Sequence, residues 1–259
     1  MKPIQELKSK ITAVFSDLDD TLTTHGQLSS AVYEQIFRIK KAGMRFVIVS
    51  GRPAGWADCL MRLWPIDAMI FENGAGYYVR TSEGFETHYL ASLENVQKHR
   101  AHLSDVFEKI RAEIPSARLA RDQNYRVLDF AVDICEDLPH LNATEVKKVC
   151  DLLDKEKEIT YKVSSIHINY WRGTHTKVTA CKHLLENFGK TWGISLEKSI
   201  FCGDSPNDEP LFHFFPESVG VANISEFKDQ LTHFPKYVTK KPCGEGFQEV
   251  SSLILTPVN

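Results

Sequence analysis

The sequence lacks the features that mark several large classes of protein. Its six cysteines form no CxxC pair and no cysteine–histidine spacing typical of a zinc site. No apolar stretch is long enough to span a bilayer, and the amino-terminal residues contain no apolar core of a signal peptide. We therefore expect a cytoplasmic protein without a membrane partner, whose cysteines are mostly small buried hydrophobes.

An excess of positive charge is also missing. The 259 residues include 31 lysines and arginines against 34 acidic residues, a formal net charge of −3 at pH 7. Nucleic-acid binding usually needs a basic face, so this balance argues against a nucleic-acid partner. The phosphate-binding loop GxxxxGKS/T is absent as well, and so are internal repeats and low-complexity linkers. No pattern indicates an oligomeric state.

What the sequence does contain is an alternation of short apolar runs and amphipathic stretches. Ser29 and Ser30 can cap a helix that Gly43 ends, Pro53 stands where another can begin, and a third is predicted from Lys177. Apolar runs typical of strands buried on both faces of a parallel sheet occur at 11–15, 46–49, 68–71 and 200–202. This alternation predicts an α/β fold with a doubly wound, Rossmann-like parallel sheet.

The middle of the chain has a different pattern. Helices are predicted from about Leu93 to Ile114 and from about Ala143 to Lys157, next to two alternating strands at 127–134 and 159–172. One face of these strands is apolar and includes Ile166. The opposite face carries Asp129, Asp133, His167, Asn169 and Trp171. We therefore predict an inserted α+β cap domain at 83–173, with a core domain formed by 1–82 and 174–259.

An acidic motif follows the first predicted strand. Asp17 and Asp19 are two residues apart, so in an extended chain both side chains project from the strand's carboxyl end, where open α/β sheets bind ligands. A solvated acidic turn would have the same short pattern. An EF-hand is excluded, because Leu22 and Leu28 stand where that loop needs glycine and glutamate.

Other predicted strand ends also carry polar residues. Ser50-Gly51-Arg52 follows one strand, and Asp204 and Asp208 follow another within GDSPND at 203–208. Carboxylates gathered at one sheet edge would repel one another by roughly 4 kcal/mol per pair at ~4 Å and an effective dielectric of about 20. A cation among them removes this repulsion. An all-oxygen donor set favours Mg²⁺, and a carboxylate can accept a phosphoryl group as a nucleophile.

Together these motifs resemble those of the haloacid dehalogenase superfamily. DLDDT at 17–21, SGR at 50–52, Lys177 and GDSPND at 203–208 are similar to its four motifs in order and spacing. The insertion after ENGA at 72–75 resembles the type IIB, Cof-like group, which includes sugar-phosphate phosphatases and a phosphomutase. One departure is Asp20, where glycine is frequent in that group.

The resemblance implies a Mg²⁺-dependent phosphatase acting on a small phosphorylated metabolite, with a sugar phosphate as the expected substrate and an aspartyl-phosphate intermediate. It implies Asp17 as nucleophile and metal ligand, and Asp19 as general acid and base whose backbone carbonyl also reaches the metal. Asp204 and Asp208 would complete the metal site. The implied phosphate- and substrate-binding residues are Thr21, Ser50, Gly51, Arg52, Asn73, Lys177 and Asn207. His167 and Asn169, on the polar face of the cap, are expected to contact the leaving group.

Two other functions are weighed against this one. A phosphomutase of the same superfamily would need a bisphosphate activator and contacts to a second phosphate, and the sequence leaves it open. A non-catalytic sugar-phosphate sensor would be expected to have lost Asp17 or Asp19, and both are present. The substrate itself depends on the cap, where only a strand and helix pattern is available.

Overall fold

The computed structural model describes residues 1–94 and 96–256, whose strands form two sheets. The larger sheet has the order β1-β12-β11-β10-β2-β3-β4-β5-β6 and the smaller one the order β7-β9-β8. The larger sheet consists of β1 (Lys2–Pro3), β2 (Ala13–Ser16), β3 (Arg45–Val49), β4 (Ala68–Phe71), β5 (Gly76–Thr81), β6 (Gly84–Tyr89), β10 (Ser199–Gly203), β11 (Glu217–Gly220) and β12 (Tyr237–Val238). The smaller one consists of β7 (Asp129–Asp133), β8 (Ile159–Val163) and β9 (His167–Arg172).

Helices cover both faces of the larger sheet and one face of the smaller sheet. The α-helices are α1 (Ser30–Lys41), α2 (Ala54–Leu63), α3 (Val96–Glu113), α4 (Ala143–Leu153), α5 (Lys177–Trp192), α6 (Glu209–Phe214) and α7 (Cys243–Ile254). The 3-10 helices are η1 (Ile4–Glu6), η2 (Glu72–Gly74), η3 (Arg121–Tyr125), η4 (Leu196–Lys198), η5 (Pro206–Asp208) and η6 (Ala222–Gln230). Helix α1 begins and ends as expected, because Ser29 Oγ accepts from the Val32 backbone N–H and Gly43 has a φ of +81°.

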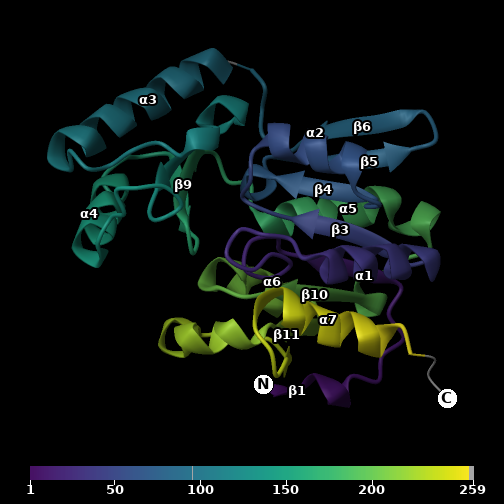
Figure 1. The fold of residues 1–259 in the computed structure, drawn as a ribbon. Coiled ribbons are helices and arrows are strands. Elements are labelled where there is room, and N and C mark those ends of the chain that lie inside the picture. Colours follow the sequence, from purple (N-terminus) through teal and green to yellow (C-terminus); the bar gives the residue numbers. More distant parts are fainter. Residues whose placement is uncertain (95, 257–259) are drawn as a thin grey trace.

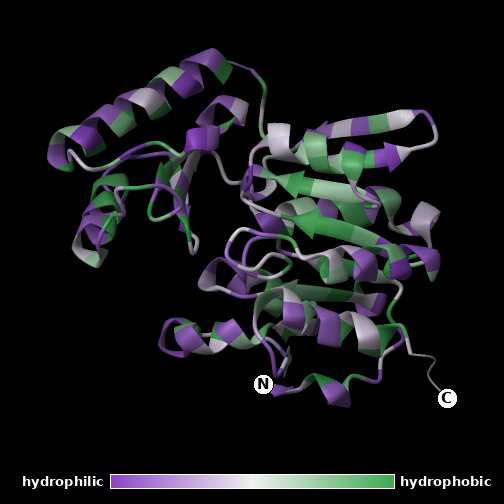
Figure 2. Cartoon of the chain, in the orientation of Figure 1, coloured by the Kyte–Doolittle hydropathy of each residue, from purple (hydrophilic) through white to green (hydrophobic). Residues whose placement is uncertain are grey.

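The larger sheet confirms the predicted doubly wound α/β core. Its strands from β1 to β4 in the sheet order are all parallel. Side chains of β3 alternate between two apolar clusters: Phe46 and Ile48 pack with α1, α2 and α7, whereas Val47 and Val49 pack with α5 and α6. The hydrophobic colouring of β3 and β4 in Figure 2 reflects burial on both faces. The arrows of these strands point toward the inserted segment (Figure 1).

The boundary predicted at residue 83 is too early. β5 and β6 form an antiparallel hairpin that extends the larger sheet beyond β4, so residues 84–89 belong to the core sheet. The segment 84–89 is only partly buried at this edge. Its sequence therefore does not need the continuous apolar run that marks the central strands. Positions 95 and 257–259, within a predicted helix and the predicted core segment, lie outside the described residues.

The smaller sheet has three antiparallel strands rather than the two predicted. The stretch 159–172 was predicted as one strand, but it forms the hairpin β8–β9. At its turn, Ser164 Oγ accepts hydrogen bonds from the backbone N–H of His167 (3.0 Å) and of Ile166 (3.4 Å). A serine hydroxyl that bonds the nearby backbone in this way favours a turn over an extended strand. Ile166 therefore lies in the turn and not on the apolar face.

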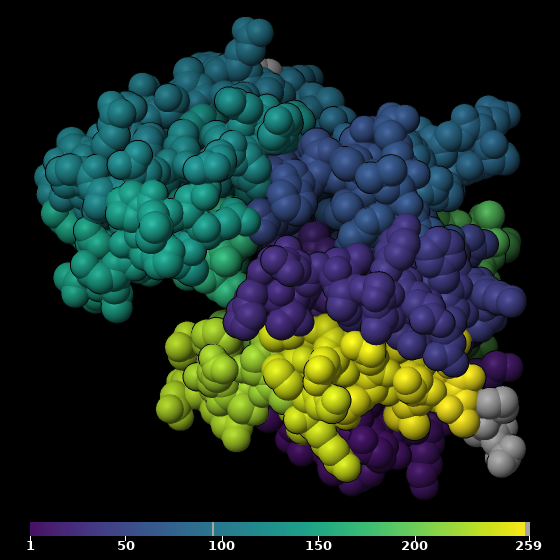
Figure 3. Space-filling model, in the orientation of Figure 1, coloured from purple at the N-terminus to yellow at the C-terminus, as the bar shows by residue number. Residues whose placement is uncertain are grey.

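The apolar face of the smaller sheet packs on α3 and α4, as predicted. Phe130, Val132, Ile168 and Tyr170 join the helical residues of both helices in one buried cluster. Helix α4 ends at Leu153, earlier than predicted. The opposite face is not open to solvent, however, because it lies against the core. In Figure 3 the inserted segment, in teal, forms a lobe that overhangs one side of the core. None of the helices in the described parts of the chain has the length and apolarity needed to cross a membrane.

Candidate active site

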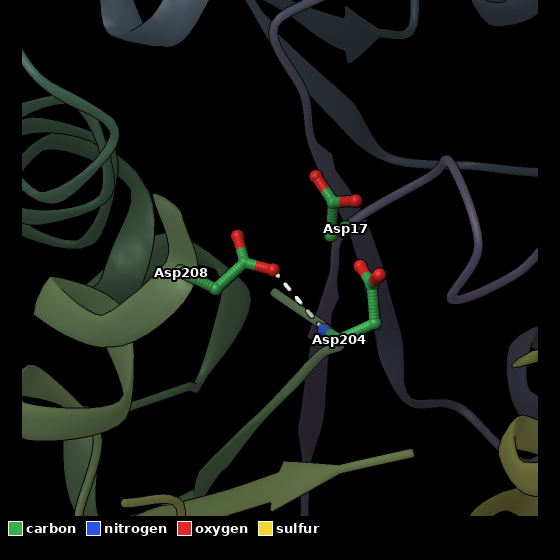
Figure 4. Close-up of side chains that lie close together, drawn as sticks. All are labelled: Asp17, Asp204 and Asp208. Carbon is green, nitrogen blue, oxygen red and sulfur yellow. Dashed lines mark hydrogen bonds between the residues drawn. The ribbon is translucent and has the colours of Figure 1, made fainter. Parts of the chain in front are cut away.

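Three aspartates meet where the parallel strands β2 and β10 end. Asp17 directly follows β2 and Asp204 directly follows β10, and the two strands are neighbours in the sheet. One carboxylate oxygen from each of Asp17, Asp204 and Asp208 lies within 4.8 Å of the others, and all three residues are buried. Figure 4 shows this cluster and the bond that Asp208 Oδ2 accepts from the Asp204 backbone N–H, at 3.2 Å. The strand ends thus gather the carboxylates as the sequence predicted.

One lysine faces the acidic cluster. Lys177 opens α5, and its Nζ donates to Asp17 Oδ1 at 2.7 Å and to Asp208 Oδ1 at 2.9 Å. Burial raises the pKa of Asp17 to about 8 despite the nearby Lys177 cation. Burial and the Asp17 carboxylate also raise the pKa of Asp204. A single cation therefore leaves three buried carboxylates incompletely compensated, which is the electrostatic setting of a divalent metal site.

Asp204 is held by two further side chains. Thr21 Oγ1 donates to its Oδ1 at 3.1 Å, and Asn223 Nδ2 lies 3.3 Å from its Oδ2. Asn223 also donates to the backbone carbonyl of Asp20 at 3.2 Å, which joins the two acidic loops. Asp20 has a φ of +54°, in the left-handed region that glycine adopts freely and aspartate tolerates. This explains physically why glycine suits that position.

The Ser50-Gly51-Arg52 loop lies beside the acidic cluster. Arg52 Nε and Nη2 each donate to one oxygen of Asp19 at 2.9 Å, so both Asp19 oxygens are engaged. Ser50 is buried, and its Oγ accepts from the Arg52 backbone N–H at 3.0 Å. A Cβ on Gly51 would come within 3.1 Å of Asn73 Nδ2, which explains the need for a small residue there.

Arg52 also reaches the inserted segment. Its Nη2 donates to Glu136 at 2.6 Å, and its Nη1 lies 3.4 Å from Asp122. Burial opposes ionisation of Glu136, but hydrogen bonds from His167 and Arg52 outweigh it and lower the Glu136 pKa to about 2. A chain of contacts therefore runs from His167 through Glu136 and Arg52 to Asp19. Arg52 is predicted from its motif, whereas Glu136 is not, because a single glutamate between two strands carries no distinguishing pattern.

Glu72 connects the core to the inserted segment through more hydrogen bonds than Arg52 does. Its buried carboxylate accepts hydrogen bonds from four backbone N–H groups, those of Ala54 (3.0 Å), Val127 (2.8 Å), Leu128 (2.7 Å) and Asp129 (3.1 Å). Arg126 adds a bond from Nη1 to the Gly51 carbonyl at 2.9 Å. The ENGA motif at 72–75 does not by itself indicate this role of Glu72. Its φ of +46° is a feature of the backbone that composition does not indicate.

His167 and Asn169 lie at the site, and each has a side-chain nitrogen close to a carboxylate of the protein. Both line a cavity of about 20 Å³ together with Asp17, Ser50 and Asp204. Asn169 Nδ2 donates to Asp129 Oδ2 at 3.0 Å, and His167 Nε2 lies 2.9 Å from Glu136 Oε2. Burial raises the pKa of Asp129 to about 7 against the pull of the Arg126 cation.

Asp133 and Trp171, also on the predicted polar face, do not line this cavity. Asp133 accepts from the backbone N–H groups of Glu136 (2.8 Å) and Asp137 (3.0 Å), so it fixes a turn. Trp171 is buried and stacks on His175. Alternation along β9 thus predicted the two faces, but it did not indicate the protein groups that the polar face contacts.

A larger cavity adjoins the small one. It has a volume of about 520 Å³ and is lined in part by Lys177. Asn73, Lys162 and Asn207 line both cavities, so the two are contiguous. Every predicted core residue from Asp17 to Asp208 is therefore placed around one site. Lys162, from the inserted segment, was not identified from the sequence.

The chain is similar to known hydrolases in sequence and in fold. The profile of a family described as haloacid dehalogenase-like hydrolase matches residues 14–110 and 97–250. Phosphoglycolate phosphatases of Methanosarcina acetivorans and Methanobrevibacter smithii are 24% and 25% identical, over 93% and 92% of this chain and 95% and 96% of their own lengths. The trehalose-6-phosphate phosphatase C-terminal domain of C. albicans superposes with a TM-score of 0.72 at 15% identity, covering 97% of this chain and 94% of that one. At 15% identity, the similarity to the trehalose-6-phosphate phosphatase domain shows a shared fold and nothing about the substrate of this chain.

Proposed function

Because the chain belongs to the haloacid dehalogenase-like hydrolase family and is a phosphoric monoester hydrolase, we propose that it hydrolyses a small sugar phosphate with Mg²⁺ and a phosphorylated Asp17. The observation that carries this proposal is the position of Asp17. Its carboxylate lies 2.7 Å from Lys177 Nζ and beside the carboxylates of Asp204 and Asp208, at the carboxyl end of a parallel strand. The phosphatase names of the two curated relatives support the reaction class.

The donor set fits a magnesium ion. Asp17, Asp204 and Asp208 offer hard carboxylate oxygens within 4.8 Å of one another, and burial, together with the neighbouring carboxylates, raises the pKa of Asp17 and of Asp204. These three residues, with the backbone carbonyl of Asp19, would hold the ion. When bound, it would neutralise phosphoryl oxygens and make phosphorus a better electrophile.

Two displacements at phosphorus make up the proposed reaction. A carboxylate oxygen of Asp17 attacks phosphorus, the bond from phosphorus to the ester oxygen breaks, and Asp19, which takes up a proton from solvent on release from Arg52, gives that proton to the departing alcohol. Water then attacks the same phosphorus and gives a proton to Asp19, while the bond to Asp17 breaks. Inorganic phosphate leaves, Asp17 is again a carboxylate, and Asp19 is again protonated for the next turnover.

Lys177 and Ser50 are the groups placed to bind the phosphoryl oxygens during both steps. Lys177 supplies a buried cation beside the nucleophile, where low solvent exposure strengthens its attraction for developing charge. Asp19 has to release at least one of its two bonds to Arg52 before it can reach the ester oxygen. Arg52 therefore controls the position of the general acid, which connects the inserted segment to the proton transfer through Glu136.

The test is release of inorganic phosphate from p-nitrophenyl phosphate and from a panel of sugar phosphates. Activity with Mg²⁺ and its loss by at least a thousandfold in Asp17→Asn would support the proposal, because asparagine keeps the shape but removes the attacking charge. A phosphomutase would instead yield an isomeric sugar phosphate with a bisphosphate activator. A sensor would bind sugar phosphates and release no phosphate. Near-normal turnover in Asp17→Asn would rule out the covalent mechanism.

A further inference from the structure

The cavity of about 520 Å³ lies where a leaving group would extend from the phosphoryl site. It shares Asn73, Lys162 and Asn207 with the small cavity that contains Asp17 and Ser50, and Lys177 lines its wall. A cavity of this size is in the range of small-molecule sites. A phosphoryl group bound at Asp17 would thus have its ester substituent directed toward a space large enough to hold it.

The charged residues that line this cavity are all basic, although the chain carries a net charge of −3. Its lining includes three lysines and no aspartate or glutamate. Lys177 is already bonded to Asp17 and Asp208. Among the described residues, no carboxylate lies within ion-pair distance of Lys162 or Lys182. Both side chains are exposed, so solvent screens their charges from each other, but together they make the rim of the cavity positive and favourable for an anion.

Two buried N–H donors at the same cavity also lack partners. Within the part of the chain that the structure describes, neither Asn73 Nδ2 nor Trp171 Nε1 has a hydrogen-bond acceptor, and both residues are at least nine-tenths buried. Buried donors are almost always satisfied, because leaving one without a partner costs about 1–3 kcal/mol. Both N–H groups are covered by neighbouring atoms, so a ligand in the cavity would have to displace those atoms before its oxygens could accept from them.

The two lysines come from different parts of the fold. Lys162 lies on β8 of the inserted segment, opposite Asn169 of β9, whereas Lys182 lies on α5 of the core. Phe214, also at the cavity, lies 5.4 Å from Lys182 Nζ and limits where that side chain extends. A ligand bound by both lysines would therefore bridge the core and the inserted segment.

On these observations, and resting on the phosphatase function proposed above, we propose that the leaving group carries a second anionic group, a carboxylate or a second phosphate, which Lys162 and Lys182 bind in this cavity. The apolar part of the lining would pack on the carbon skeleton between the two anions. Substrates with an uncharged leaving group would leave both lysines without a counter-ion. The inference thus narrows the proposed substrate to a phosphate ester whose leaving group itself carries a carboxylate or a second phosphate.

The experiment compares matched esters that differ in the second charge. Phosphoglycolate against 2-hydroxyethyl phosphate tests a carboxylate, and fructose 1,6-bisphosphate against fructose 1-phosphate tests a second phosphate. We expect the more highly charged member of at least one pair to have a kcat/KM at least tenfold higher. Lys162→Met and Lys182→Met should each lower that ratio by about tenfold. Lys190→Met, an exposed position on the same helix α5, should leave it unchanged.

Binding to the Asp17→Asn variant separates this inference from the proposed mechanism. Titration calorimetry with the same pairs does not require turnover, so it reports the second-anion site even in a protein that releases no phosphate. Tighter binding of the more highly charged member, lost with either lysine, would support the site. Equal affinity within both pairs, or a preference that survives both lysine substitutions, would overturn it while leaving phosphate release and its dependence on Asp17 unaffected.

Discussion

The core and the inserted segment contribute to the active site by different structural means. The core places Asp17 and Asp204 at the ends of adjacent parallel strands that are buried between two layers of helices. The inserted segment has helices on one face only, and its other face becomes buried by contact with Arg52, Glu72 and Gly51 of the core. The proposed reactive groups thus lie at one edge of the buried core sheet, whereas the proposed contacts to the leaving group depend on how the two sheets meet.

From this difference we expect substitutions at the edge of the core sheet to change the rate of phosphate release. Substitutions where the core meets the inserted segment should instead change how the two parts pack and which substrate is preferred. Arg52 is buried, whereas its interface partner Glu136 is partly exposed, so loss of Glu136 would leave part of a buried cation without its counter-ion. The carboxylate cluster in the core is instead expected to depend on a bound cation, as proposed above. The following predictions separate these two kinds of dependence, beginning with the largest expected effect.

Removing divalent metal should have the largest effect. We expect EDTA to abolish phosphate release and Mg²⁺ to restore it, while Ca²⁺ supports little turnover because its longer, less regular coordination misplaces the nucleophile. Mg²⁺ should also raise the midpoint of thermal unfolding in wild type and much less in Asp204→Asn, as expected for a ligand that binds the folded state. Full activity after exhaustive chelation would contradict this account of the acidic cluster.

Loss of Glu72 should weaken the attachment of the inserted segment. Glu72→Gln removes the charge and one acceptor oxygen from a carboxylate that receives four backbone N–H bonds. We expect the free energy of unfolding to fall by about 2 kcal/mol or more, measured by urea denaturation. Glu83→Gln, at an exposed position, is the matched control. Equal stability of the two variants would show that Glu72 does not hold the interface.

Glu136→Gln should have a smaller effect, confined to turnover. The substitution weakens the contacts to Arg52 and His167, so Arg52 and the Asp19 carboxylate that it positions become less ordered. We expect kcat to fall about three- to tenfold with a small change in KM. Glu108→Gln, exposed on α3, serves as control. An unchanged kcat, with the fold intact by circular dichroism, would show that the contact between Glu136 and Arg52 does not affect proton transfer by Asp19.

Asn169→Ala should have the smallest effect of the four. Asn169 donates to Asp129 and lies 3.4 Å from the Gly51 carbonyl, so its amide helps to position the hairpin β8–β9 over the site. We expect KM for the preferred sugar phosphate to rise a few-fold, and by more than KM for p-nitrophenyl phosphate, because the latter has no hydroxyl groups to bind. An equal change for both substrates would show that Asn169 has no part in selecting the leaving group.

The sequence predicts the core better than the interface, for a physical reason. Asp17, Ser50 and Asp204 are each preceded by an apolar run, and parallel strands bring their carboxyl ends to one edge, so local pattern determines their meeting. β6 was missed because an edge strand is only partly buried and shows no such run.

The interface depends on contacts between residues far apart in the chain. Glu72 bonds the backbone more than fifty residues later, and Lys162 is one charged residue in a chain that is 25% charged. No periodicity marks either. The hairpin turn at Ser164 was also missed, since two adjacent serines fit an exposed strand as well as a turn. The positions of His167 and Asn169 on one face followed from alternation, but their protein partners did not.

The most direct test of the account is to identify the phosphorylated residue. The enzyme would be mixed with a sugar phosphate and Mg²⁺, quenched in acid during turnover, digested and examined by mass spectrometry. The account predicts a phosphoryl group on the peptide that contains Asp17, absent from the Asp17→Asn variant and lost on further incubation at neutral pH. A phosphoryl group on any other residue would contradict it, and so would undiminished phosphate release by Asp17→Asn.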